Sequence, residues 1–152
     1  MLEFLAWMLV WMDRCGNEPL SAMSTEVLRS IRGVLFDIDD TLTTHGRLTA
    51  GAYSALEALQ QAGLITIPIT GRPAGWCDHI ARMWPVDGVV GENGAFYFCF
   101  DRAAKKMQQR FIKDDQTRAA DRERLAAVAR RILAEIPGCA MASDQAYREA
   151  DI

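Results

Sequence analysis

The sequence predicts an α/β protein with a three-layer, mainly parallel sheet, and two observations carry that prediction. Apolar runs of strand length lie at 34–36, 64–70 and 87–91, and segments with apolar residues at helical spacing separate them. This alternation is expected when a helix connects neighbouring parallel strands. Acidic and hydroxyl residues follow the first two runs directly, at the strand ends where sheets of this kind bind ligands.

Helix signals mark both connections. Thr49 is placed to cap the first helix, and Gly63 supplies its end. Pro73 suits the first turn of the second helix, because its missing amide hydrogen costs nothing there. Pro68 is awkward inside the second strand, since it cannot donate to a ladder. The apolar stripe of the second helix is predicted to be Trp76, Ile80, Met83 and Trp84.

The last third of the chain predicts a hairpin and a long helix. Residues 96–100 and 108–112 have the composition of two paired strands. A helix with one apolar face is predicted from Asp114, and Pro137 helps to stop it. Residues 140–152 are interpreted as the start of another strand. The apolar face of the long helix consists of Leu125, Val128, Ala129, Ile132, Leu133 and Ile136.

Length and charge narrow the class of protein. The chain has 152 residues, about one domain, and half of them are hydrophobic. A net charge of −3 without a basic stretch argues against nucleic acid as the main partner, because binding its backbone needs clustered Lys and Arg. The cysteines at 15, 77, 99 and 139 form no Cys-x-x-Cys pair, so no zinc site is indicated. We expect reduced, mostly buried thiols in a cytoplasmic protein.

Residues 1–22 are interpreted as an N-terminal extension. Met1–Met12 is apolar but too short to span a bilayer, and it lacks the basic start of a secretory signal. No transmembrane segment is therefore expected. Three interpretations stay open: an amphipathic segment on a membrane or partner, a core-packing helix, or translated sequence upstream of a start at Met23. The last is favoured, because the recognisable domain needs nothing before Ser24.

The first strand leads into a cluster of acids. Asp37 and Asp39 are two residues apart, so an extended backbone sends both side chains to the same side. Two carboxylates this close repel unless a cation joins them, and hard oxygen ligands favour Mg²⁺. The sequence thus predicts a Mg²⁺ site with Asp37 and Asp39 as ligands. The alternative is a solvated turn, since Asp and Thr favour turns and caps.

The second strand ends at a predicted anion site. A phosphate near Thr70 would meet a hydroxyl, the free amides of the Gly71 loop and the positive end of the helix that begins at Pro73. Arg72 could add a charged fork to the same anion. A plain surface arginine near a helix start is the alternative for that residue.

Two motifs together resemble a known family. Residues 37–41 (Asp-Ile-Asp-Asp-Thr) fit the Asp-x-Asp-x-Thr signature of the haloacid dehalogenase (HAD) superfamily, and 69–72 (Ile-Thr-Gly-Arg) is similar to its second motif. The resemblance implies that Asp37 is the nucleophile, forming an aspartyl phosphate, and that Asp39 is the acid and later the base. Thr41 falls on the fixed position of the motif and is expected to brace the loop.

The third strand end carries a weaker resemblance. Residues 91–95 (Gly-Glu-Asn-Gly-Ala) look like a segment of the type IIB branch, the sugar-phosphatase and Cof-like members. In that branch the segment lies near the rim of the active site, so Asn93 is a candidate for contacting substrate or ordering the rim. The alternative is a plain turn residue, since Asn-Gly is a strong turn signal.

The resemblance also implies a domain plan. Residues 23–112 would form part of a Rossmann-like HAD core, and 113–152 the beginning of an inserted α/β cap. Two further family motifs, a Lys and a late acidic pair, find no good match in this sequence. The implied function is Mg²⁺-dependent hydrolysis of a small phosphate ester, most plausibly a sugar phosphate, by a complete protein of which this chain is a fragment that would be inactive alone.

Two other classes stay open. One is a non-catalytic module that binds Mg²⁺ or a phosphorylated ligand. The other is a receiver-like phosphoacceptor domain, although in such domains the acidic pair and the phosphoacceptor sit on different strands, whereas Asp37 and Asp39 share one.

Overall fold

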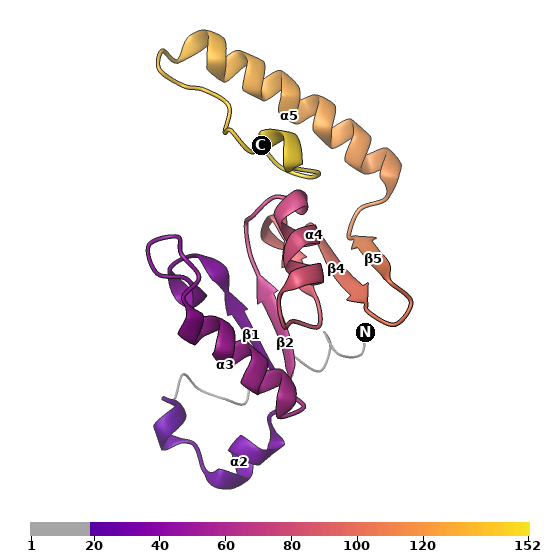
Figure 1. Ribbon diagram of the computed structural model, residues 1–152. Helices are drawn as coiled ribbons and strands as arrows, with labels where there is room; N and C mark the ends of the chain where they lie inside the picture. The colour runs from indigo at the N-terminus through magenta and orange to yellow at the C-terminus, as the bar shows by residue number, and fades with distance from the viewer. Residues whose placement is uncertain (1–18) are drawn as a thin grey trace. The chain divides into compact units, whose positions relative to one another are not determined.

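A computed structural model describes residues 19–152, which divide into a short N-terminal part and a larger unit, Arg32–Ile152 (Figure 1). The strands are β1 (Gly33–Asp37), β2 (Ile65–Ile69), β3 (Val89–Gly91), β4 (Phe96–Asp101) and β5 (Lys106–Phe111). The α-helices are α2 (Thr25–Ser30), α3 (Ala50–Gln61), α4 (Ala74–Met83) and α5 (Asp115–Glu135). Short helical turns are η1 (Leu20–Ala22), η2 (Ile38–Leu42), η3 (Glu92–Gly94) and η4 (Gln145–Tyr147).

The N-terminal part contains a helix that the sequence patterns did not predict. Ser24 caps α2, because its hydroxyl oxygen accepts a hydrogen bond from the Val27 amide at 3.2 Å. The interpretation of residues 1–22 as an extension lies outside the described residues, except for 19–22. No helix in the described range 19–152 is both long and apolar enough to cross a membrane.

The sheet is mixed rather than mainly parallel. Its order is β1-β2-β3-β4-β5, with β1, β2 and β3 parallel and β4 and β5 each antiparallel to the strand before it. The register aligns Asp37 with Ile69 and Ile69 with Val90. The three parallel strands therefore end at one edge of the sheet. The predicted hairpin corresponds to β4 and β5.

Both crossover helices lie on one face of the sheet (Figure 1). Right-handed crossovers that run in the same direction along a sheet place their helices on the same side. Helix α3 packs on β2, and α4 packs on β3 and β4. The arrangement formed by Arg32–Ile152 at the sheet is thus two layers, and the expected third layer is not present among the described elements.

The core lies between this face and the helices, and its composition corrects one prediction. Ile80 is buried as predicted, but Trp76 is 45% exposed and Met83 is 61% exposed. Helix α4 instead packs its small residues close to the sheet, including Cys77, and Trp76 lies at the surface under the Arg72 guanidinium at 4.7 Å. The buried core consists of Ile38, Leu56, Ala74, Cys77, Ile80, Ala81, Val86, Val89, Phe96 and Phe98.

Pro68 is accommodated inside β2 by the geometry of its neighbours. Amides of alternate residues in a strand point to the same side, and the amides of Thr66 and Thr70 both point towards the β3 side. Thr66 donates to the Asp87 carboxylate at 2.8 Å, and Thr70 donates to the Val90 carbonyl at 2.9 Å. Pro68, which has no amide hydrogen, lies between these two residues, so the missing donor is on the β3 side. The pairing of β2 with β1 is therefore intact.

Helix α5 forms as predicted, but its apolar face is only partly covered in the described residues. Ala129 is buried, whereas Val128, Ile132, Leu133 and Ile136 are 38–51% exposed. The tail after this helix is not a strand. It makes the turn η4 and then runs irregularly through 148–152, because its amides bond to a carboxylate of the sheet unit rather than to another strand.

Candidate functional site

The predicted site residues meet at the carboxyl ends of β1 and β2. A cavity of about 690 Å³ there is lined by Asp37 and Asp39 from the end of β1, by Thr70 and Gly71 after β2, and by Asn93 from η3. Its apolar wall is formed by Leu35, Phe36 and Ile69. One cavity therefore contains five of the predicted residues.

The first of these acids ends β1 and starts the turn η2. An oxygen of the Asp37 carboxylate accepts a hydrogen bond from the Ile38 amide at 2.8 Å, while Ile38 itself is buried in the core. The turn is closed by Thr43, whose amide and hydroxyl both donate to the Ile38 carbonyl at 2.9 Å. The bracing hydroxyl is thus that of Thr43, which is buried, and not that of Thr41, which is exposed.

Asp39 is already paired in this structure. The Arg72 guanidinium donates to both of its carboxylate oxygens, from Nε at 3.1 Å and from Nη2 at 2.5 Å. Two parallel bonds of this kind are the strong form of an Arg–carboxylate contact. The Asp39 side chain is 49% exposed, which limits the net stabilisation to about 1 kcal/mol. Arg72 therefore contacts the second acid instead of being free for an anion.

Thr70 is buried at the base of the cavity, with 3% exposure. Its hydroxyl oxygen accepts a hydrogen bond from the Arg72 amide at 3.2 Å. A hydroxyl that accepts in this way can still donate its own hydrogen. The next residue, Gly71, lies so close to Asn93 that an added Cβ would be 3.0 Å from Oδ1, so a side chain there would press on the rim.

The turn η3 is strained and is fastened to this loop. Glu92 and Asn93 have positive φ values of 44° and 56°, an uncommon conformation for residues with a side chain. The Glu92 amide donates to the Arg72 carbonyl at 3.3 Å, and the Asn93 amide donates to the Thr70 carbonyl at 3.1 Å. The strain and the two bonds place the Asn93 side chain, which is exposed, at the rim of the cavity.

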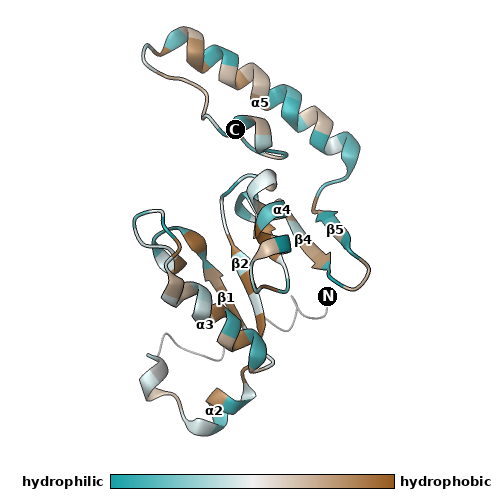
Figure 2. Ribbon diagram, in the orientation of Figure 1, coloured by the Kyte–Doolittle hydropathy of each residue, from teal (hydrophilic) through white to brown (hydrophobic). Residues whose placement is uncertain are grey.

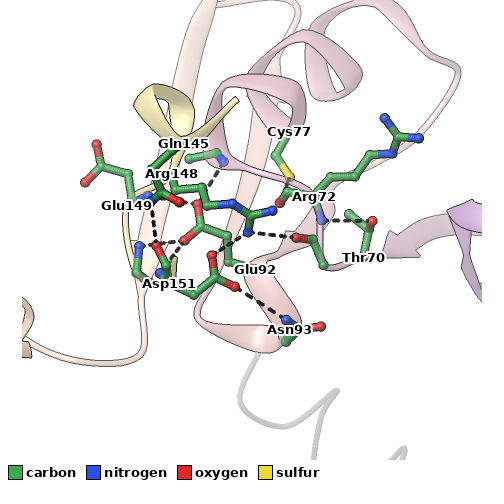
Figure 3. Close-up of polar contacts among 12 residues, drawn as sticks. Thr70, Arg72, Cys77, Glu92, Asn93, Gln145, Arg148, Glu149 and Asp151 are labelled. Carbon is green, nitrogen blue, oxygen red and sulfur yellow. Dashed lines mark hydrogen bonds and ion pairs between the residues drawn. The ribbon is translucent and has the colours of Figure 1, made fainter. Parts of the chain in front are cut away.

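The start of α4 is occupied by Glu92 and is not open to an anion. The Ala74 amide donates to Oε1 of Glu92 at 2.9 Å, and Gly75 lies against the Tyr147 ring. Figure 3 shows the Glu92 carboxylate among residues of the tail. The Ala74 amide, at the helix end where the sequence predicted an anion, is thus already bonded to Glu92 in this structure.

Sequence reasoning missed Glu92 as a functional residue. It is 3% exposed, and its carboxylate is compensated by backbone amides. The available signal was an acid that directly follows the apolar strand β3, where burial without partners would be costly. Its partners in the tail are 57–59 residues away in sequence, so no local pattern could identify them.

Burial disfavours the reactive, ionised form of two of the described thiols. Burial, and secondarily the charge of Glu92, raise the pKa of Cys77 to about 12. Burial also raises the pKa of Cys99. The expectation of mostly buried thiols holds for Cys77, whereas Cys99 is half-buried and Cys139 is exposed. All three are free, and Cys15 lies outside the described range.

A divalent cation fits the cavity only in part. Among residues 19–152, no group of three or more His, Cys, Asp or Glu side chains is close enough to hold a metal ion. Asp37 and Asp39 supply two exposed carboxylates in one cavity, which suits Mg²⁺ because that ion keeps several of its waters. Arg72 would have to release Asp39 for both acids to bind.

Comparisons with known proteins agree with the fold. A family model described as haloacid dehalogenase-like hydrolase matches residues 34–122, whereas no curated protein sequence matches the chain. A solved structure from Thermoplasma acidophilum has a TM-score of 0.57 at 18% identity, over 79% of this chain and 48% of that one. This likeness supports the fold alone.

Two other similar solved structures are those of phosphatases. One, from Bacteroides thetaiotaomicron, belongs to the haloalkanoate superfamily and is 22% identical with a TM-score of 0.48, over 72% of this chain and 40% of that one. The other is a sugar phosphatase of HAD subclass IIB, 32% identical with a TM-score of 0.39, over 45% and 28%. The chain spans less than half the length of each of the three proteins. Because the family model covers more than half of the chain, the chain belongs to the haloacid dehalogenase-like hydrolases.

Proposed function

We propose that this chain carries the nucleophile half of a Mg²⁺-dependent phosphatase of the type IIB branch, which hydrolyses a small phosphate ester, most plausibly a sugar phosphate. The single observation that carries the proposal is the cavity that Asp37, Asp39 and Thr70 line together. Family membership supports the reaction class. The proposed domain plan is a partial core over residues 23–112 and the beginning of a cap over 113–152.

Each residue has a defined part in this reaction. The Asp37 carboxylate attacks the phosphorus, and the ester oxygen leaves with a proton from Asp39. Asp39 then takes a proton from the water that hydrolyses the aspartyl phosphate, which returns both acids to their starting state. The Thr70 hydroxyl and the amides of the Gly71 loop orient the phosphoryl oxygens. Asn93 would order the rim above them.

Mg²⁺ would be held by Asp37 and Asp39. When bound, it would neutralise the charge of the two acids and of the phosphoryl oxygens. For Asp39 to bind Mg²⁺, Arg72 must release it and turn to an anion or to solvent. Its bidentate fork suits a phosphate as well as a carboxylate.

An apolar surface on the sheet supports the proposed domain plan. Leu35 and Ile67 are paired neighbours that point away from α3 and α4, and Ile65 and Ile69 are 37% exposed. Figure 2 shows the hydrophobic character of β1 and β2. We interpret this face as the surface on which the third layer packs in a complete three-layer core.

The Arg72–Asp39 pair favours a second candidate, a module that binds a phosphorylated ligand or Mg²⁺ without turning it over. Both carboxylate oxygens of Asp39 accept bonds from the arginine, so this acid is not free to contact the oxygen of an ester. In such a module the cavity would be a binding site only. The two candidates differ in whether any form of the protein hydrolyses an ester.

The test is a panel of sugar phosphates and one aryl phosphate, assayed with Mg²⁺ and with a chelator. We expect a longer form of the protein to turn over part of the panel, and its Asp37→Asn variant to lose at least 1,000-fold in kcat, on the order of 4 kcal/mol. The 152-residue chain alone should not exceed its own Asp37→Asn variant. Clear turnover by this chain would contradict its incompleteness, and no turnover by the longer form would favour the binding module.

A further inference from the structure

The Glu92 carboxylate binds the end of the chain through consecutive backbone amides. Its Oε1 accepts from the Glu149 amide at 2.9 Å, and its Oε2 accepts from the amides of Ala150 at 2.5 Å and Asp151 at 3.1 Å (Figure 3). Hydrogen bonds to a charged acceptor are about twice as strong as neutral ones. A single side chain thus holds three amides of residues 147–151, called here the C-terminal segment.

The same carboxylate belongs to the loop system of the site. Oε1 also accepts from the Ala74 amide at 2.9 Å, which follows the Thr70–Arg72 loop by two residues. The backbone of Glu92 and Asn93 is bonded to that loop at Arg72 and Thr70. Glu92 therefore connects the C-terminal segment, the start of α4 and the anion loop at one point.

The C-terminal segment contacts two residues that line the cavity. The Arg148 guanidinium donates to the Gly71 carbonyl at 3.2 Å and pairs with Asp151. The Asn93 amide nitrogen Nδ2 donates to the Asp151 carboxylate at 3.5 Å. Because Gly71 and Asn93 both line the cavity, a shift of the segment would move two of its walls.

The backbone conformation of η3 is the second observation that supports a positioning role for Glu92. Glu92 and Asn93 adopt the left-handed region without being glycine, and Gly94 follows with a φ of 99°. A non-glycine residue adopts this region at an energetic cost and keeps it where its surroundings fix it. The strain directs the Glu92 side chain inward and the Asn93 side chain to the rim.

We propose that Glu92 is a positioning residue that fixes the C-terminal segment against Gly71 and Asn93, and thereby sets the shape of the phosphate site. This inference rests on the proposed function for its last clause only. The bonds from the Glu149, Ala150 and Asp151 amides to the Glu92 carboxylate, called here the clamp, form whether or not a phosphate binds. Displacing the segment frees the Gly71 carbonyl and the Asn93 side chain together.

The test is amide hydrogen exchange, followed by NMR, in the whole chain and its Glu92→Gln variant. The substitution keeps the size but replaces one acceptor oxygen by an NH₂ group that faces amide donors. We expect the amides of Glu149, Ala150 and Asp151 to exchange at least tenfold faster, and the Gly71 and Asn93 signals to shift. Glu123→Gln, an exposed position on α5, is the matched control and should change neither.

A second variant approaches the clamp from the other side. Ala150→Pro removes one donor of the C-terminal segment without altering Glu92, and should also release Glu149 and Asp151, whereas Ala140→Pro in the exposed connection after α5 should not. Should both clamp variants leave these amides protected, or Glu92→Gln release only Ala74, Glu92 is merely the cap of α4 and the inference is wrong.

Titration of the same samples with inorganic phosphate and Mg²⁺ separates the two proposals. If the clamp shapes the site, phosphate should bind the Glu92→Gln protein at least fivefold more weakly than the unaltered chain. Equal affinity alongside released amides would overturn the effect on the site. Absence of phosphate binding by the unaltered chain, with the exchange result as expected, would count against the proposed function and leave the clamp intact.

Discussion

The ion pair between Arg72 and Asp39 has a direct consequence for cation binding. A cation at Asp37 and Asp39 must displace the guanidinium, which makes two bonds to Asp39. A half-exposed pair is worth up to about 1 kcal/mol, so Arg72→Gln should raise the affinity for Mg²⁺ roughly two- to fivefold, as measured by calorimetry. Arg82→Gln, which removes an exposed pair with Asp78 on α4, is the control. Weaker Mg²⁺ binding by Arg72→Gln would show that the arginine assists the cation instead of competing with it.

The three described thiols should differ widely in reactivity. The thiolate is the reacting form, and burial raises the pKa of Cys77 to about 12, so almost none of it is ionised at neutral pH. We expect an alkylating reagent at pH 8 to modify the exposed Cys139 first, Cys99 more slowly and Cys77 at least 100-fold more slowly than Cys139, as followed by peptide mass spectrometry.

The effect of the Glu92 charge on the pKa of Cys77 can be measured separately. The charge of Glu92 contributes to the raised pKa, so Glu92→Gln should lower it towards the ordinary value of 9.0. Absorbance of the thiolate during a pH titration measures that change. A Cys77 that is labelled as fast as Cys139 in the unaltered chain would contradict its burial between α4 and the sheet.

Local chemistry explains which site residues could be predicted. Asp37, Asp39 and Thr70 could be placed at one edge from strand alternation and the parallel crossover alone, and all three line one cavity. The partner of Asp39 and the role of Glu92 could not, because both depend on contacts across at least 33 residues. Thr43, and not Thr41, braces the loop, because the path of η2 turns the Thr43 hydroxyl inward to the Ile38 carbonyl.

At the scale of the elements, helix α5 depends on its N-cap. The Asp114 carboxylate accepts from the Thr117 amide at 2.7 Å, and this bond lowers the pKa of Asp114. A lowered pKa in the folded state means that the stabilisation is present above the unfolded pKa of about 3.9 and is lost as the pH falls through the folded value. Asp114→Ala should therefore lower the Tm at pH 7, whereas Asp114→Asn should largely retain it.

The pH dependence completes that prediction. The difference in Tm between the unaltered chain and Asp114→Ala, followed by circular dichroism, should shrink below pH 4, because the protonated acid no longer favours the cap. Asp144→Ala serves as a matched control, since this acid makes no side-chain bond to the first turn of η4. A difference that stays constant from pH 7 to pH 2 would show that the charge of Asp114 is irrelevant.

Elements with strong periodicity and end signals could be predicted closely. Thr49 caps α3 through a 3.2 Å bond from the Ala52 amide, and Gly63 follows the helix with a φ of 77°. The buried face of α4 could not be predicted. The hydrophobicity of Trp76 suggested that this residue would be buried, but the helix packs close to the sheet through small residues such as Cys77. The tail was misjudged for a related reason: its conformation is set by Glu92, not by its own sequence.

The whole molecule shows the limit of a topological argument. Strand, helix, strand and helix predicted the parallel arrangement of β1, β2 and β3, but not that β4 would pair antiparallel with β3 and join the predicted hairpin to the same sheet. What the chain does contain is one edge of the sheet with two acids, a buried hydroxyl and a strained rim.

The most direct test of the account is to trap the phosphorylated residue. Acetyl phosphate has a leaving group that needs no acid, so it should phosphorylate the nucleophile slowly even where groups that assist an ester are missing. After incubation with Mg²⁺, borohydride reduction converts an aspartyl phosphate to homoserine, which peptide mass spectrometry locates. If Asp37 is the nucleophile, we expect homoserine at Asp37 and none in the Asp37→Asn variant. Homoserine at Asp39 or at any other acid, or at none, would contradict it.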